Sequence, residues 1–120
     1  DTERDLMIKM EGQAVYNFVV PAIIEVINDL LTRNRLTIDD ISCIVPHQAN
    51  QRILEAAAKR SRIPYEKFYV NIERYANTSA ATIPIALNEL YENGKLSSGD
   101  LIITVGFGAG LTYGGNLLKW

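Results

Sequence analysis

The sequence is poor in the residues that build covalent or metal-bound centres. It has 120 residues, of which one is a cysteine, Cys43, and one is a histidine, His47. A single cysteine excludes an internal disulfide, and the lone thiol fits a reducing compartment. With no second histidine or thiolate at ligand spacing, the histidine is a poor candidate for a zinc ligand, so we expect no metal site.

The chain also lacks the features of two other protein classes, a strong excess of positive charge and a long apolar run. It has 12 lysines and arginines against 14 acidic residues, a net charge of −2, which argues against a nucleic-acid partner. No apolar run approaches the roughly 18 residues of a membrane span. The opening residues, DTERDLMIKMEGQ, lack the basic region and apolar core of a signal peptide. We therefore expect a cytoplasmic domain with no membrane partner.

Hydrophobic periodicity is present and predicts three helices. Apolar residues recur at helical spacing from Val15 to Leu31, with Pro21 inside the pattern as an expected kink or restart. A second helix is predicted from about Asn50 to Ser61. The third is predicted over residues 77–94, opened by Asn, Thr and Ser and closed by Asn-Gly.

Short apolar segments alternate with these helices and predict strands. The segment ISCIV is one, and a second follows Pro64 within residues 62–72. The last 22 letters, residues 99–120, read as two strands around a glycine turn. Such alternation predicts an α/β fold, a mixed β-sheet packed by helices, in a single domain over residues 1–120.

Cys43 and His47 invite a nucleophile-and-base interpretation, which their spacing disfavours. Four extended residues span roughly 13 Å, whereas a base must lie within hydrogen-bond reach of its nucleophile. Strand alternation also places Cys43 with Ile41 and Val45, as a small core residue. We interpret Cys43 as structural.

Two polar residues occupy places where functional groups collect. His47 follows a predicted strand and precedes a helix, the edge at which open α/β sheets bind ligands. Asn77 opens the third helix, where its structural interpretation is a helix cap. On position alone, both residues fit a structural role as well as a functional one.

The glycine-rich run GFGAGLTYGG does not predict dinucleotide binding. Leu111 stands where the last glycine of the fingerprint belongs, and too few residues follow for a helix, a strand and an acidic ribose ligand. A tight turn that brings backbone amides close to a site fits better.

Three motifs together carry a resemblance to a known family. They are VPHQAN, then NTSAATIP thirty residues after the histidine, then VGFGAGLTYG near the end of the chain. In this order and spacing they closely resemble β-ketoacyl-acyl-carrier-protein synthase III, of the thiolase-like superfamily. The likeness runs from about Glu11 to Trp120 and covers the carboxy-terminal half of that enzyme, so it implies a thiolase-like half-fold.

The resemblance implies a Cys-His-Asn active site that joins an acyl-CoA to malonyl-acyl carrier protein by a decarboxylative Claisen reaction, the first condensation of fatty acid synthesis. His47 and Asn77 match the family's histidine and asparagine, and Ala109 carries the backbone amide that matches its glycine turn. Ala76 replaces the family's usual glycine before the asparagine. The family's nucleophilic cysteine lies in the amino-terminal half, and Cys43 does not match it. No cofactor is implied, since acyl-CoA is a substrate.

Further contacts follow from the same resemblance. Gly12, Tyr16 and Asn50 match residues near the pantetheine tunnel, with Tyr16 in place of a phenylalanine. The expected carrier-protein surface comprises Gln48, Ala49, Asn50, Gln51, Arg52, Lys59 and Arg60. The implied partners are acyl carrier protein, acyl-CoA, the amino-terminal half of the enzyme and, when it is complete, a second copy.

Two alternatives stay open at this point. One is a related thiolase-fold enzyme with the same histidine and asparagine, of the hydroxymethylglutaryl-CoA or polyketide type. The other is a non-catalytic module that binds carrier protein or CoA. The sequence of the cysteine-bearing half, with its acyl pocket, would distinguish the related enzymes from one another. Thioester turnover would exclude the non-catalytic module.

Overall fold

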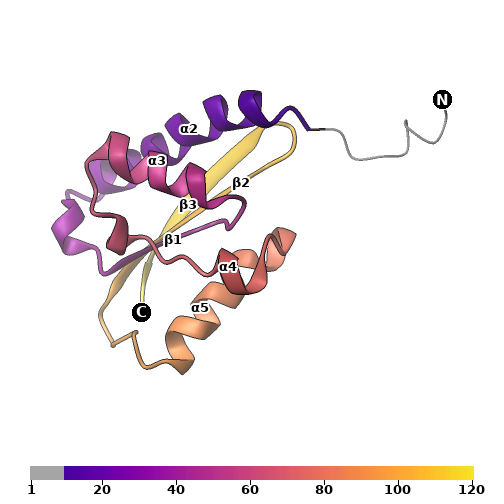
Figure 1. Ribbon diagram of the computed structural model, residues 1–120. Helices are drawn as coiled ribbons and strands as arrows, with labels where there is room; N and C mark the ends of the chain where they lie inside the picture. The colour runs from indigo at the N-terminus through magenta and orange to yellow at the C-terminus, as the bar shows by residue number, and fades with distance from the viewer. Residues whose placement is uncertain (1–9) are drawn as a thin grey trace, which may run out of the picture.

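A three-stranded mixed sheet with helices on both faces forms the centre of the molecule (Figure 1). The computed structural model describes residues 10–120. In the sheet β1 pairs parallel to β2, and β2 pairs antiparallel to β3, which confirms the predicted α/β fold with a mixed sheet. The main elements are α2 (Gly12–Arg33), β1 (Cys43–Pro46), α3 (Gln51–Ser61), α4 (Ile72–Tyr75), α5 (Thr82–Glu92), β2 (Leu101–Gly108) and β3 (Thr112–Lys119).

The two faces of the sheet carry separate hydrophobic clusters. α2 and α3 pack on one face, where the apolar stripe predicted for α2 supplies Val19, Ile23 and Ile27 to the larger cluster. α5 packs on the other face through Ala86 and Leu90. Both faces of β1 and β2 are therefore covered, which explains why these strands are apolar throughout.

α2 is a single helix of 22 residues that continues through Pro21. The expected restart is absent, and Pro21 lies on the exposed side of the continuous helix. By length and composition alone α2 is also apolar enough to cross a membrane, which the sequence analysis did not predict. Its inward stripe, however, belongs to the core cluster against the sheet.

The strand predicted within residues 62–72 is wrong. A 3-10 turn (Tyr65–Lys67) is followed by one isolated parallel bridge between Phe68 and Ile44, and then by the short helix α4. Pairing with β1 does not continue past this bridge, because the Asn71 backbone N–H bonds to the Gln48 side chain at 3.1 Å instead of to β1.

The predicted third helix begins later than its polar opening suggests. A separate 3-10 turn covers Ser79–Ala81, and α5 proper starts at Thr82. The second helix agrees closely with its prediction, since Asn50 caps it by accepting the Arg52 N–H at 2.8 Å.

Gly115 allows α2 to lie against β3. A Cβ built on Gly115 would lie 2.4 Å from Val26 Cγ1 and 2.5 Å from the Thr104 carbonyl oxygen. A real Cβ atom cannot occupy that space unless the helix or the strand pair moves. The adjacent Gly114 has no atom within 4 Å of the same position.

We expect Gly115→Ala to lower the free energy of unfolding by roughly 1–3 kcal/mol, the usual effect of overpacking. Gly114→Ala is the matched control and should leave it nearly unchanged. Denaturant unfolding of the three chains measures the difference. Equal stabilities for the two variants would show that α2 does not rely on this close contact.

Candidate active site

His47 lies immediately after β1, at the carboxyl end of the parallel strand pair. Its backbone N–H donates to the Val105 carbonyl at 2.8 Å, which extends the β1–β2 pairing by one residue. The imidazole packs edge-on against Phe107, with ring centroids 5.0 Å apart and an interplanar angle of 89°. The side chain is therefore held by β2 at the sheet edge where the sequence predicted a site.

The imidazole has one hydrogen-bond partner among the described residues, the Thr82 hydroxyl at the start of α5. The distance from His47 Nδ1 to Thr82 Oγ1 is 2.6 Å. Burial lowers the pKa of His47 below its ordinary value of 6.5, because a charged imidazolium loses hydration there. At neutral pH the ring is uncharged and carries a single N–H.

Asn77 lies between α4 and the 3-10 turn that precedes α5. Its Oδ1 accepts the Ser79 backbone N–H at 3.0 Å, a local turn ahead of the 3-10 turn. The helix cap expected from the sequence is wrong, because α5 begins at Thr82 and has no side-chain cap. The bond to Ser79 still fixes the amide orientation and leaves the Nδ2 donor group for another acceptor.

The backbone before Asn77 is strained. Ala76 has φ 56° and ψ −158°, a region that is essentially restricted to glycine. The family's glycine at this position is thus explained by geometry, and alanine in this chain adopts the same conformation at a cost in free energy.

Two cavities meet at His47 and Asn77. One of about 460 Å³ opens toward α5, and another of about 500 Å³ opens toward the beginning of α2. Both are also lined by the turn residues Phe107, Gly108 and Ala109. The histidine, the asparagine and the glycine turn, which are far apart in sequence, therefore face one space.

Ala109 fits the turn without strain. Among the described residues other than glycine, positive φ occurs at Arg35, Arg62, Ala76 and Ser79. Ala109 is not one of them. The residue of this turn with positive φ is Gly110, at 131°. Ala109 itself lines both cavities.

Cys43 has no access to this space. It lies in the smaller core cluster, where burial raises the pKa of its thiol to about 11. A thiol with such a pKa is almost entirely protonated at neutral pH and is a poor nucleophile. Among residues 10–120 no group of three potential metal ligands comes together either.

The residues expected near a pantetheine tunnel do converge. Gly12, Tyr16 and Asn50 line one cavity of about 450 Å³, together with Gln13, Arg52 and Ile53. The guanidinium of Arg60 lies 6.0 Å from the Tyr16 ring centroid, so α2 and α3 meet at this cavity through a cation–π contact.

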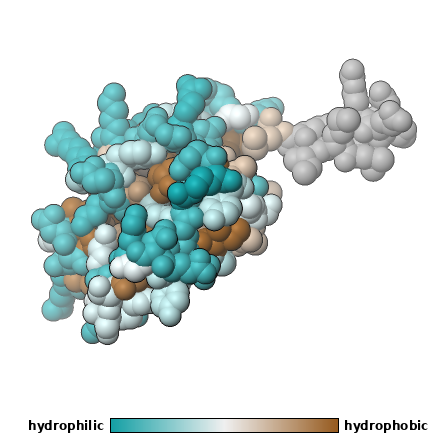
Figure 2. Space-filling model, turned by 60° about the horizontal axis from the view of Figure 1, so that its bottom comes forward, coloured by the Kyte–Doolittle hydropathy of each residue, from teal (hydrophilic) through white to brown (hydrophobic). Residues whose placement is uncertain are grey.

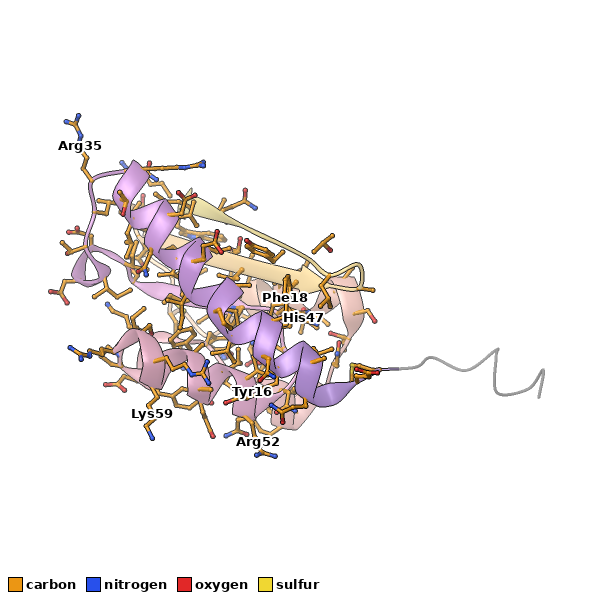
Figure 3. The ribbon with its side chains drawn as sticks, turned by 90° about the horizontal axis from the view of Figure 1, so that it is seen from above. Tyr16, Phe18, Arg35, His47, Arg52 and Lys59 are labelled. Carbon is orange, nitrogen blue, oxygen red and sulfur yellow. The ribbon has the colours of Figure 1, made fainter. Side chains whose placement is uncertain are left out.

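The expected carrier-protein surface is exposed only in part. Gln51, Arg52, Lys59 and Arg60 are exposed on α3, and Figure 3 shows Arg52 and Lys59 pointing outward along the same side of the helix. Ala49 is half-buried. Gln48 is 1% exposed, so a docking role for its side chain does not fit the structure.

The Gln48 side chain instead joins three segments of backbone. Its Nε2 donates to the carbonyls of Pro46 at 2.9 Å and Tyr69 at 3.0 Å, and its Oε1 accepts the Asn71 N–H. No local pattern in the sequence indicates this role. Thr82 and Phe107 were also missed, although each lies inside a motif that the sequence analysis quoted.

Fold and cavity together define a class of protein. A strand-end histidine, an asparagine ahead of α5 and a glycine turn line one cavity in a mixed α/β domain, as expected for the thiolase-like fold. Sequence comparison then gives the family. The chain belongs to the family described as 3-oxoacyl-[acyl-carrier-protein (ACP)] synthase III C terminal, whose profile matches residues 31–120.

Individual relatives agree with this membership. The β-ketoacyl-[acyl-carrier-protein] synthase III of Clostridium novyi (strain NT) is 50% identical over 113 residues, covering 94% of this chain and 35% of that protein. The crystal structure of 3-oxoacyl-[acyl-carrier-protein] synthase III from Aquifex aeolicus VF5 has a TM-score of 0.89 at 43% identity, covering 93% of this chain and 36% of that one.

A priming β-ketosynthase from the R1128 polyketide biosynthetic pathway is also similar. It has a TM-score of 0.83 at 34% identity, and the match covers 92% of this chain and 34% of that one. The chain thus spans about a third of the length of the relatives it matches.

The strain at Ala76 can be measured directly. We expect Ala76→Gly to raise the free energy of unfolding by about 1 kcal/mol, because removing strain of about 1–3 kcal/mol outweighs the entropy cost of a glycine. Ala80→Gly, at an exposed position four residues later, is the control and should lower stability. Chemical denaturation compares them, and a loss of stability in both variants would mean that Ala76 is unstrained.

Proposed function

We propose that this chain is the carboxy-terminal catalytic domain of a β-ketoacyl-acyl-carrier-protein synthase III. The complete enzyme condenses an acyl-CoA with malonyl-acyl carrier protein and so starts fatty acid synthesis. The observation that carries the proposal is the convergence of two neutral N–H donors, His47 and Asn77, on one cavity. Family membership and the similar relatives support the same activity.

The two side chains suit the stabilisation of an enolate. When malonyl thioester loses carbon dioxide, the C–C bond electrons move into an enolate whose oxygen carries the charge. That oxygen needs preorganised donors, which are worth a few kcal/mol each in comparable oxyanion sites. Asn77 Nδ2 and the imidazole N–H supply them, since Asn77 Oδ1 is already occupied by Ser79.

Condensation completes the reaction. The enolate carbon attacks the acyl-cysteine carbonyl, a C–C bond forms, and the cysteine thiolate leaves. In this proposal an amino-terminal domain supplies the cysteine, because the thiol of Cys43 is buried and protonated. The backbone N–H of Ala109 serves the oxyanion that forms during acyl transfer. No cofactor takes part, since both substrates arrive as activated thioesters.

Substrate access follows the surface features between α2 and α3. The cavity at Gly12, Tyr16 and Asn50 takes the pantetheine arm, and the exposed basic residues of α3 receive an acidic carrier protein. Figure 3 shows Arg52 and Lys59 on the same side of the molecule as Tyr16. The complete enzyme is expected to be a cytoplasmic homodimer.

A polyketide-type synthase is the second candidate, and the similarity to the R1128 priming ketosynthase favours it. Both enzymes use the same donors, so this chain's site fits either. The two enzymes differ in the acyl group that starts the chain, and the acyl pocket of the amino-terminal domain selects that group. A hydroxymethylglutaryl-CoA-type enzyme or a non-catalytic binding module has weaker support from the relatives. A lack of thioester turnover by the assembled enzyme would favour the module.

In an enzyme assembled from this chain and an amino-terminal domain, we expect His47→Ala and Asn77→Ala to slow malonyl decarboxylation roughly 10²–10³-fold. Cysteine acylation by acyl-CoA should be much less affected, because it depends on the cysteine and on backbone amides. Separate assays of the two half-reactions test this, with Asn88→Ala on the exposed face of α5 as control. Equal losses in both half-reactions would contradict the proposed roles.

Arg52→Glu tests the carrier-protein surface. We expect it to lower kcat/KM for malonyl-acyl carrier protein, mainly through slower association. Acylation by acyl-CoA should be affected less, since it involves only the contact of Arg52 with the pantetheine cavity. Added salt should reduce the difference from wild type, because it screens exposed charges.

Arg35→Glu is the matched control, since Figure 3 places Arg35 at the opposite end of the molecule from Arg52. It makes the same change in net charge and should have no effect on carrier-protein kinetics. Normal use of carrier protein by Arg52→Glu at low salt would exclude this docking surface.

A further inference from the structure

Thr82 contacts the imidazole of His47 from the start of α5 and also lines the cavity of about 460 Å³. Its hydroxyl is the only hydrogen-bond partner of the imidazole within residues 10–120, at 2.6 Å from Nδ1. Thr82 is 2% exposed and is the first residue of α5. A bond of this length to a buried hydroxyl restricts both the ring orientation and the place of its proton.

The direction of this bond follows from the hydrogen-bonding capacity of the hydroxyl. A threonine hydroxyl has one proton to donate and two lone pairs. If Nδ1 carried the proton and donated to Oγ1, the threonine proton would need a second acceptor. No other bond of Thr82 Oγ1 is present in the described structure, so that proton would have no protein acceptor at a residue that is 2% exposed, which is costly.

The opposite direction leaves no proton unpaired. The Thr82 hydroxyl donates to the Nδ1 lone pair, and only hydroxyl lone pairs stay unused, which proteins tolerate better. The amino end of α5 favours the same arrangement, because the positive potential of its N–H groups makes a lone pair on the nearby Nδ1 more favourable than an N–H there.

We propose that Thr82 is a positioning residue that donates its hydroxyl proton to His47 Nδ1 and so fixes the neutral tautomer with the proton on Nε2. That nitrogen is the one left to face the cavities that His47 lines. The use of the Nε2 proton for an enolate rests on the function proposed above. The tautomer itself does not, and it can be measured without any substrate.

The chain offers a clean measurement, since His47 is its only histidine. Long-range ¹H–¹⁵N spectra of the labelled chain, at alkaline pH where the ring is neutral, report which nitrogen is protonated. We expect Nε2 to be protonated in wild type. In Thr82→Val the ratio of Nε2–H to Nδ1–H tautomers should fall roughly 2- to 10-fold, the equivalent of one hydrogen bond.

Conservative variants separate positioning from packing. Thr82→Ser keeps the hydroxyl and should restore the wild-type tautomer ratio, whereas valine keeps the shape and loses the donor. Thr32→Val, at an exposed position on α2, is the matched control and should leave the ratio unchanged. If Thr82→Val does not fold, Thr82→Cys replaces it as a weaker donor and should give an intermediate ratio.

Several results would overturn the proposal. They are a dominant Nδ1–H tautomer in wild type, an unchanged ratio in Thr82→Val, or no restoration by serine. A failure of the proposed condensing activity would leave these spectra unaffected. Conversely, a wrong tautomer would leave the donor role of Asn77 intact, so the two ideas fail in distinguishable ways.

Discussion

The buried amide of Gln48 holds the two halves of the site together. It follows His47 directly and bonds to the backbone of Pro46, Tyr69 and Asn71. Pro46 is the last residue of β1, and Tyr69 and Asn71 lie at the start of the segment that leads to Asn77. A buried amide with its donors and acceptor paired gives one defined arrangement. The relative position of histidine and asparagine therefore depends on this side chain more than on any contact between the two residues.

The other constraints act on orientation and charge. Phe107 packs edge-on against the imidazole, Thr82 bonds to its Nδ1, and Ser79 binds the Asn77 oxygen. Burial keeps the histidine uncharged. The cavity therefore presents fixed neutral donors, which suits a charge that exists only during reaction. Figure 2, which brings the α5 side forward, shows apolar surface there in separate areas among hydrophilic ones.

Periodicity in the sequence predicted the three long helices, the three strands and the mixed sheet, because apolar spacing directly reflects which face is buried. The motifs predicted His47, Asn77 and Ala109, and the structure brings them around one space. The strand after Pro64 was wrong because a long-range bond from Gln48 competes with strand pairing, which no local pattern reveals. Thr82 was missed for a similar reason, since its partner lies 35 residues away. Gln48 was assigned to the carrier-protein surface through the resemblance, whereas its side chain is buried by bonds to Tyr69 and Asn71 that the motif does not reveal.

The central claim is that His47 and Asn77 donate to the same substrate oxygen. The most direct measurement is a crystal structure of this chain with its amino-terminal domain and a non-hydrolysable malonyl thioester analogue. The account predicts the thioester carbonyl oxygen at about 2.7–3.1 Å from both His47 Nε2 and Asn77 Nδ2, as for other preorganised oxyanion sites. An analogue bound in the cavity with that oxygen bonded to neither side chain would contradict it.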